Sequence, residues 1–451
     1  MERVISRCVF VCFLACCAYA CGAARHVFDT MEAYGYAVDD AVNLYLVGRK
    51  KEGPGTDMYF AVTKIGRDGR KCWDRVYEAA EDGYGCAIAV VLDGQGNVWV
   101  AGRVDVARNT GKDSGLALVK YSADGKVLAD SIYKKPGHGS RFYGMQVLGE
   151  EGICIGINSY ELPRWSSLSF NLLLYDAAGK KVREDVAGAS PMLACIGASN
   201  LCVGEFDTDK GPDCDQVFSI VEIDARGERS VLKAMRVEAD QMGPWIIAGD
   251  RDGNFYIADD RDDSESEMAT AVLCKFSRGG DALWTYVLGR RVPAAENEKA
   301  SLHDLRVEVD EAGNVYVAEM FAEPIEHRRQ ESRGLSFAPQ KVTGLRVCKL
   351  NRDGTRAWSY EHRTDANDLT YVGPFLLRVL KSGHVLCIFL VEGEGVKADL
   401  GCSKADLYGL YVGPDGKELG SGRMREPSDW GQIFADKQVM AVDRPKDVPV
   451  K

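Results

Sequence analysis

The chain has 451 residues, of which 46% are hydrophobic and 27% charged, a composition typical of a globular protein and not of a disordered or collagen-like one. Its formal net charge of −11 argues against nucleic acid or an anionic membrane surface as the main partner, because both attract a concentrated basic patch. Forty-eight glycines against 14 prolines indicate many tight turns, as in an all-β protein.

The first twenty residues have the order of a signal peptide. Arg3 and Arg7 give a positive start, residues 8–20 are apolar or small, and Ala18-Tyr19-Ala20 is a small-x-small cleavage pattern. The apolar stretch is too short for an ordinary transmembrane helix, and no later stretch reaches that length. We therefore expect residues 1–20 to be removed and the rest to be exported and soluble.

Cys21, directly after this pattern, has two interpretations. It is either an ordinary first residue or the lipidated cysteine of a bacterial lipoprotein. The segment resembles a relaxed lipobox, with Tyr19 at a position that is usually small and Ala18 in place of the usual leucine, and Cys16 is a second candidate. A diacylated cysteine is a stable two-chain anchor. We predict lipidation at Cys21, followed by a tether over residues 21–33.

Cysteines in the mature chain lie mostly within apolar strand patterns, where a cysteine behaves as a small hydrophobe. No CxxC pair is present, so the spacing predicts no zinc site. Cys202 and Cys214 flank one predicted loop, and sequence alone leaves open whether they form a disulfide.

Two turn signals each recur seven times along the rest of the chain. The first is a Gly-Asn-like turn before a β-branched or aromatic run, as in Gly96-Asn97-Val98-Trp99-Val100-Ala101-Gly102. The second is Asp-Gly or a relative after a short apolar strand, as in Leu118-Val119-Lys120-Tyr121 before Asp124-Gly125. Both dipeptides favour hairpin turns because they tolerate positive φ.

Each period therefore contains four short strands, named A to D in chain order. Repeat two shows them at residues 86–92, 98–102, 116–121 and 127–133. A four-stranded unit repeated seven times predicts an all-β fold, a seven-bladed β-propeller over residues 34–430. Residues 431–451 are predicted as a closing hairpin, with strands at 432–435 and 439–442, and a tail. Two alternatives stay open: an eighth blade completed by residues 26–29, and two stacked β-sandwiches.

The repeats resemble the SBBP/NHL type of bacterial propeller, over roughly residues 34–420. The resemblance is carried by Ala89-Val90-Val91-Leu92-Asp93-Gly94-Gln95-Gly96-Asn97-Val98-Trp99 and the strand and Asp-Gly turn that follow. Trp73, Trp284 and Trp358 come shortly after the C–D turn, as aromatics do in related repeats. The resemblance implies the architecture and leaves function open, because propellers include both enzymes and binding scaffolds.

Antiparallel strands place the tight A–B and C–D turns on one face of the ring and the longer B–C and D–A connections on the other. Long loops are where binding residues usually lie, so we expect the partner to bind the second face. The blade-six insertion carries basic and aromatic side chains suited to a partner contact, and blade three offers one indole. These candidate partner-binding residues are His327, Arg328, Arg329, Arg333, Phe337 and Trp165.

Two further features are candidate ion-binding sites. The acidic run 259–267 offers Asp259, Asp260, Asp262 and Asp263 as oxygen ligands for Ca²⁺, although no EF-hand spacing is present and a solvated loop is the plainer interpretation. Arg306 and Arg378 lie in or near A strands at the central channel, where they form either an ion-pair network or a site for a small anion.

The sequence contains no HExxH, GxSxG, Walker A or helix-opening GxGxxG pattern, so no catalytic residue, cofactor or metal is predicted. The leading hypothesis is a monomeric, lipid-anchored scaffold that binds a protein or peptide in the bacterial envelope, on the periplasmic side or at the cell surface. The first alternative is a propeller hydrolase, lyase or lactonase with its site at the channel mouth. The second is a carbohydrate-binding propeller.

Overall fold

A computed structural model of the chain describes most of the predicted repeat region. The described residues are 26–28, 31–51, 58–77, 84–105, 114–135, 138–148, 152–161, 166–187, 189–196, 200–206, 216–223, 228–237, 246–263, 268–291, 305–322, 342–363, 369–393, 405–424 and 426–435. Within them, no helix is long and apolar enough to cross a membrane.

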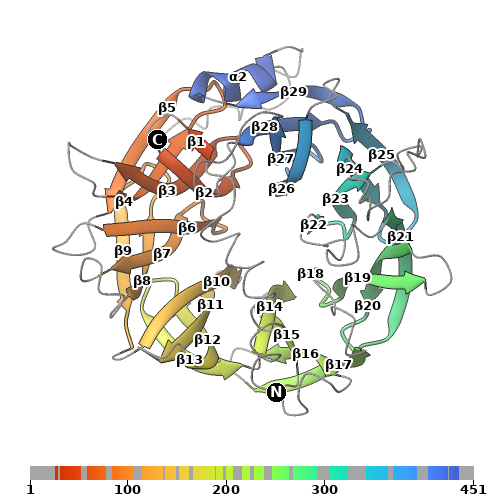
Figure 1. The fold of residues 1–451 in the computed structure, drawn as a ribbon, viewed down its shortest axis with the longest axis horizontal. Coiled ribbons are helices and arrows are strands. Elements are labelled where there is room, and N and C mark those ends of the chain that lie inside the picture. The colour runs from red at the N-terminus through yellow and green to blue at the C-terminus, as the bar shows by residue number, and fades with distance from the viewer. Residues whose placement is uncertain are drawn as a thin grey trace, which may run out of the picture.

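The strands form seven separate antiparallel sheets arranged around a ring (Figure 1). This confirms the seven-bladed β-propeller and excludes the stacked sandwiches. In repeat two the predicted strands correspond to β6 (Tyr84–Leu92), β7 (Val98–Asp105), β8 (Ser114–Tyr121) and β9 (Val127–Tyr133). The A strands lie innermost and the D strands form the outer rim (Figure 1).

The other six blades follow the same order. Blade 1 is β1 (His26–Phe28), β2 (Met31–Val38), β3 (Leu44–Lys51), β4 (Met58–Ile65) and β5 (Lys71–Tyr77). Blade 3 is β10 (His138–Leu148), β11 (Gly152–Glu161), β12 (Ser166–Asp176) and β13 (Lys181–Ala187). Blade 4 is β14 (Ala189–Ile196), β15 (Asn200–Phe206), β16 (Gln216–Ile223) and β17 (Arg229–Val237).

Blade 5 is β18 (Ile246–Gly249), β19 (Phe255–Asp263), β20 (Met268–Phe276) and β21 (Ala282–Arg291). Blade 6 is β22 (Leu305–Val309), β23 (Val315–Ala322), β24 (Val342–Leu350) and β25 (Arg356–His362). Blade 7 is β26 (Leu369–Val379), β27 (Val385–Gly393), β28 (Ala405–Val412) and β29 (Glu418–Met424), and one helix follows it, α2 (Pro427–Ala435).

The core lies between neighbouring blades. Phe60 and Val62 of blade 1, for example, pack in one buried cluster with Val98, Val100 and other residues of blade 2. Both faces of each sheet are thereby covered, which explains why the strands are apolar almost continuously and do not alternate. The tight turns reverse the chain through left-handed glycines such as Gly96 (φ 78°) and Gly125 (φ 81°), as the Gly-Asn and Asp-Gly signals predict.

The ring closes through α2 and not through the predicted hairpin, because residues 432–435 are helical. Pro427 occupies the first helical position, where its missing N–H costs nothing, and Trp430, Ile433 and Phe434 are buried at helical spacing. The helix lies along the outer edge of blade 7 beside blade 1 (Figure 1). Residues 439–442 lie outside the described residues.

Close approach explains the glycine within α2. A Cβ on Gly431 would come within 2.6 Å of the Asp68 carbonyl oxygen in the C–D turn of blade 1. A Cβ on Gly69, in the same turn, would come within 2.6 Å of the Pro427 carbonyl oxygen. Two glycines therefore allow the helix and the turn to approach backbone to backbone.

The neighbouring A–B turn of blade 1 is strained. Val42 has φ 64°, a left-handed conformation that is unusual for a β-branched residue. Its carbonyl accepts a hydrogen bond from the Trp430 indole at 3.2 Å, and its side chain packs in the same core cluster as Trp430. Contacts with α2 thus hold a conformation that blades 2, 5, 6 and 7 assign to glycine.

Three boundaries differ from the predicted ones. The segment predicted as a tether over 21–33 includes β1 and the start of β2, so the blades begin at Met31. β1 adds to the A strand of blade 1 and completes no eighth blade. Strand β19 continues through Asp263, so Asp259, Asp260, Asp262 and Asp263 lie in a strand paired with β20 and not in a loop.

Candidate functional site

The predicted partner-binding residues lie outside the described residues. These are Trp165 and the insertion residues His327, Arg328, Arg329, Arg333 and Phe337, and Cys21 lies outside as well. The described strands fix where their segments attach. β23 ends at Ala322 and β24 begins at Val342, both on the face opposite the tight turns. The segment 323–341 is therefore connected to the face on which binding is expected.

The two channel candidates lie on adjacent A strands, Arg306 on β22 and Arg378 on β26. The Arg378 guanidinium Nη1 on β26 lies 2.9 Å from Oε1 of Glu308 on β22, and the Val379 backbone N–H donates to the other Glu308 oxygen at 2.7 Å. Arg306 donates to the Leu305 carbonyl at 2.8 Å. Glu308 thus connects blades 6 and 7 through Arg378.

The same network continues across the closing seam to blade 1. Asp40, in the A–B turn of blade 1, lies 3.6 Å from Arg378 Nη2 and 3.0 Å from Lys381 Nζ. Two carboxylates and two cations thus alternate over three blades at the tight-turn end of the A strands. When both carboxylates are ionised the four charges balance, and the network then presents no excess positive charge that would hold an anion.

The position of Glu308 changes its ionisation. Burial raises the pKa of Glu308 to about 7, and the nearby Asp40 charge adds to this rise, while Arg378 and the Val379 N–H oppose it. Its side chain keeps 23% of its surface accessible, so protein surrounds the carboxyl without sealing it from solvent. Glu308 is therefore a carboxyl that titrates near neutral pH at the junction of three blades.

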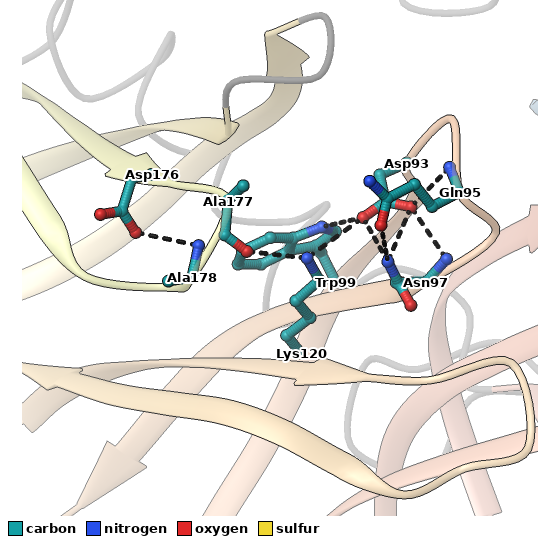
Figure 2. Close-up of polar contacts among 8 residues, drawn as sticks. All are labelled: Asp93, Gln95, Asn97, Trp99, Lys120, Asp176, Ala177 and Ala178. Carbon is teal, nitrogen blue, oxygen red and sulfur yellow. Dashed lines mark hydrogen bonds and ion pairs between the residues drawn. The ribbon is translucent and has the colours of Figure 1, made fainter.

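A recurring polar cluster, the turn quartet, forms at the A–B turn of four blades. It consists of a turn aspartate, an asparagine four residues later, an aromatic residue six residues later and a lysine from strand C. In blade 2 these are Asp93, Asn97, Trp99 and Lys120 (Figure 2). Asp93 Oδ1 accepts the Asn97 backbone N–H at 2.9 Å, and Oδ2 accepts the Asn97 amide and the Trp99 indole at 2.9 and 3.1 Å.

The lysine of the quartet links its blade to the next one. Lys120 Nζ lies 3.4 Å from Asp93 Oδ2, 4.5 Å from the centre of the Trp99 ring, and 2.8 Å from the Ala177 carbonyl in blade 3 (Figure 2). Burial alone would raise the pKa of Asp93, but the bonds from Asn97 and Trp99 and the Lys120 charge outweigh it and lower the pKa. All of these groups serve contacts within the ring.

Blades 1, 5 and 6 repeat the arrangement with tyrosine as the aromatic residue. Their tyrosine hydroxyls donate to the turn aspartates at 3.0, 3.0 and 3.2 Å, and the lysine ammonium lies 5.0 to 5.2 Å from the tyrosine ring. The members are Asp39, Asn43, Tyr45 and Lys64; Asp250, Asn254, Tyr256 and Lys275; and Asp310, Asn314, Tyr316 and Lys349.

The D-strand tryptophans make the second link between blades. Trp73, Trp284 and Trp358 donate from the indole to a carbonyl in the next blade's C–D turn at 3.0, 3.0 and 2.9 Å. Each ring lies directly beneath the glycine of that turn, where a Cβ would come within 2.8 Å. The tryptophans noticed in the sequence are therefore parts of the blade junctions.

Blade 2 fills this position differently. Ala129 stands where blades 1, 5 and 6 have tryptophan, and a Cβ on Gly179 of blade 3 would lie 2.8 Å from the Ala129 side chain. The same Cβ would lie 3.9 Å from the ring of Trp99, the only quartet aromatic among the four blades that is tryptophan and not tyrosine. The larger Trp99 on strand B thus fills space beside the smaller Ala129 on strand D.

The A–B turn of blade 5, Asp250-Arg251-Asp252-Gly253-Asn254, resembles a calcium-binding loop in sequence, but its side chains are used within the quartet. Asp250 and Asp252 both precede Gly253 in this turn. Both Asp250 oxygens accept hydrogen bonds, and Lys275 Nζ lies 3.3 Å from Oδ2. The lysine ammonium supplies the positive charge that a cation would bring. Across the described ranges, no group of three or more His, Cys, Asp or Glu side chains is placed to hold a metal ion.

Sequence reasoning missed the turn quartet although its signal was present. The pattern Asp-x-x-x-Asn-x-aromatic occurs four times, and a lysine stands in strand C of each of these repeats. Taken singly, each of these residues is an ordinary turn or strand signal. Their association depends on strand register, such as the pairing of Trp99 with Lys120, which the turn positions alone do not make obvious.

Comparisons with known sequences and solved structures assign this chain to no family. No family model and no curated protein sequence matches this chain, so the resemblance to SBBP/NHL repeats stays a prediction. Among solved structures, the chain is similar to the β-propeller domain of the Trilobed protease from Pyrococcus furiosus, with 10% identity, TM-score 0.48, and coverage of 92% of this chain and 99% of that one.

Two other solved structures show weaker likeness. Pyrococcus horikoshii acylaminoacyl peptidase has 9% identity and TM-score 0.47, with 87% of this chain and 52% of that chain covered. An α-L-arabinofuranosidase from Fusarium graminearum has 7% identity and TM-score 0.39, with 81% and 89% covered. At these identities the likeness says nothing of activity. The chain is a seven-bladed β-propeller.

Proposed function

We propose that this protein is an exported, lipid-anchored β-propeller that binds an envelope protein or peptide across the face opposite its tight turns. The observation that supports this proposal is the difference between the two faces of the ring. Turns on one face are as short as 93–97 and 351–355, whereas connections on the other include 323–341 and 394–404. Surface connections longer than the fold requires are where binding residues concentrate.

The polar residues of the tight-turn face support the same choice. The aspartates, asparagines and lysines of four turns satisfy one another, and two of the lysines and three D-strand tryptophans bond to neighbouring blades. Side chains used in this way fix the blades relative to one another. A rigid ring loses little conformational freedom when it binds, which favours a binding platform.

The anchor rests on the sequence of the first 21 residues. The charged start, apolar stretch and small-residue pattern before Cys21 are the order expected of a lipoprotein signal. A single lipidated cysteine with two acyl chains would hold the domain stably at a membrane without any spanning segment.

The anchor is tested by intact mass of the membrane-extracted protein beside a Cys21→Ala variant. We expect the mature chain to begin at Cys21 and to carry acyl mass, and we expect the variant to be soluble or uncleaved. An unmodified soluble wild-type chain would contradict the anchor.

Partner binding is tested by cross-linking in intact cells. A variant with Arg328→Ser, Arg329→Ser and Phe337→Ser should lose a cross-linked partner that wild type retains. A matched control with Arg70→Ser changes one exposed arginine on the tight-turn face and should retain the partner. Equal loss in both variants, or no loss in either, would contradict binding through the blade-six insertion.

A further inference from the structure

The seam network is the charged cluster of Asp40, Glu308, Arg378 and Lys381 where blades 6, 7 and 1 meet. Its side chains come from the innermost strands β22 and β26 and from two A–B turns, so the cluster lies at the tight-turn end of the ring's inner wall (Figure 1). The long-loop face, on which we expect a partner, is at the opposite end. The seam network is therefore a candidate site that is independent of that partner and of the lipid anchor.

Arg378 has fewer acceptors than its guanidinium group needs. Nη1 donates to Glu308 Oε1 at 2.9 Å, whereas Nη2 lies 3.6 Å from Asp40, beyond hydrogen-bond distance. Nε is buried and has no hydrogen-bond partner among the described residues. A buried donor without an acceptor is costly, and guanidinium groups bind the paired oxygens of an oxyanion especially well. The unsatisfied donor thus indicates an oxyanion as the ligand that Arg378 is suited to bind.

Both cations of the network are accessible from solvent. Lys381 keeps 75% of its side-chain surface exposed, and Arg378 keeps 36%. The two groups approach the same carboxylate, with Lys381 Nζ 3.0 Å and Arg378 Nη2 3.6 Å from the oxygens of Asp40. Two cationic donors that both approach one carboxylate are close enough to contact one small ligand.

The charge of Glu308 decides whether this pair of cations attracts an anion. With both carboxylates ionised, the four charges balance. Once Glu308 takes up a proton, it no longer neutralises Arg378, and two cations face the single carboxylate of Asp40. Burial raises the pKa of Glu308 to about 7, so the change falls near neutral pH.

Other ionisable groups lie on the elements that surround Glu308. On its own blade, Tyr316 stands opposite Glu308 and donates to Asp310, and Arg306 precedes Glu308 by two positions on β22. The turn of blade 7 that carries Lys381 also carries His384. Because histidine ordinarily titrates in the same pH range, the experiment has to separate its effect from that of Glu308.

We propose that the seam network binds a small oxyanion, such as a carboxylate or sulfate, when Glu308 takes up a proton. The ionised Glu308 side chain occupies Arg378 and so competes with the ligand, and the neutral side chain does not. The bond that Glu308 accepts from the Val379 N–H holds the carboxyl group in place in either state. The ion-pair network and the anion site that the sequence offered as alternatives for Arg378 are then two protonation states of one cluster.

Sulfate is the probe, because its charge does not change between pH 6 and pH 8. Sodium sulfate is added to the ¹⁵N-labelled full chain against sodium chloride of equal ionic strength, and NMR follows the Val379 amide and the Arg378 Nε–H. With a Glu308 pKa of about 7, about nine-tenths of the molecules are neutral at this residue at pH 6 and about one-tenth at pH 8. We therefore expect the apparent Kd to be about tenfold lower at pH 6.

Four variants locate the site. Glu308→Gln keeps the shape of the side chain without its charge, and it should bind sulfate at pH 8 as tightly as wild type does at pH 6. Arg378→Gln should lose binding at both pH values, and Lys381→Gln, at an exposed position, should weaken it severalfold. Arg352→Gln changes an exposed arginine that pairs with Asp252 on the same face, and as the control it should bind like wild type.

The comparison of wild type at the two pH values needs no variant, and equal affinity there would overturn the proposal. Chloride that moves the same signals to the same extent, or wild-type affinity in Arg378→Gln, would overturn it as well. If Glu308→Gln keeps the tenfold dependence on pH, the switch belongs to another group such as His384, and the role of Glu308 is wrong.

Discussion

Two junctions of the ring hold neighbouring blades together by different means. Between blades 2 and 3, Lys120 bonds to the Ala177 carbonyl while Asp93 and Trp99 hold the lysine in place. Between blades 7 and 1, the corresponding turn of blade 1 is covered by α2, with Gly431 against the Asp68 carbonyl. The first junction is polar, and the second adds a helix with buried aromatic side chains to the ion pairs that Asp40 makes with Arg378 and Lys381.

Chain connectivity explains the difference. Blades 2 and 3 follow one another along the chain, so a few hydrogen bonds suffice to set their orientation. Blades 7 and 1 are joined by no direct connection, and closing them carries the entropy cost of a long loop. Blade 7 accordingly replaces the quartet by apolar and aromatic residues, and its Tyr411 ring lies 5.2 Å from His384 and 5.1 Å from Phe434.

The largest expected effect is at the closing helix. Trp430→Ala removes a fully buried indole and its bond to the Val42 carbonyl, and we expect it to cost about 3–5 kcal/mol of unfolding free energy. Thermal unfolding of the purified protein measures this loss. The exposed Ser428→Ala variant on the same helix serves as the control, and a similar loss in both would contradict a special role for the indole.

The buried quartet of blade 5 should give the next largest effect. Asp250→Asn leaves the Lys275 ammonium, whose side chain is only 2% exposed, without its counter-charge. We expect a loss of about 3 kcal/mol, because an unpaired buried charge is costly. Asp415→Asn, at an exposed turn pair with Lys417, should leave the midpoint of the same denaturant titration essentially unchanged. Equal losses would show that burial does not govern the difference.

A double-mutant cycle tests the exchange of aromatic positions in blade 2. Trp99→Tyr alone leaves a gap and Ala129→Trp alone crowds the junction, and each should cost about 1–3 kcal/mol. Together they recreate the tyrosine and tryptophan arrangement of blades 1, 5 and 6. We expect the double variant to recover at least about 1 kcal/mol relative to the sum of the single losses. Additive losses would mean that the two side chains do not share one space.

The smallest effect is the pH dependence of the seam. The folded pKa of Glu308 lies near 7, above its ordinary value of 4.5, so its contribution to stability is full below about pH 4.5 and is lost as pH rises through 7. Glu308→Gln removes this titration. The unfolding temperature of wild type relative to the variant should fall by roughly 2–3 °C between pH 5 and pH 8. A constant difference over that range would contradict the raised pKa.

Most of the fold could be predicted from the sequence, because each hairpin carries its own local signal. Gly96 and Gly125 adopt the positive φ that their dipeptides suggest, and the strands of repeat two match within a few residues. Strand ends on the long-loop face were less predictable. A run of acidic residues predicts a loop, yet Asp262 pairs with Ala269 and lies in a strand.

The closing helix could have been recognised from a signal that was overlooked. Pro427 followed by apolar residues at 430, 433 and 434 is a helical pattern, but the segment is short and the expectation of another hairpin outweighed it. The network at the seam was harder to foresee. Its members, Asp40, Glu308 and Arg378, come from three blades, and only the closed ring brings them together.

The hydrogen bond from Trp430 to Val42 joins residues that are 388 positions apart in the chain. A polypeptide is made from its N-terminus, so blade 1 exists long before the helix that covers it. Until α2 arrives, the left-handed Val42 lacks the bond from the Trp430 indole to its carbonyl, and the first blade keeps an unfinished edge. Residues that are synthesised after all seven blades thus complete the first blade, and a chain truncated before Trp430 would carry seven blades without a finished ring.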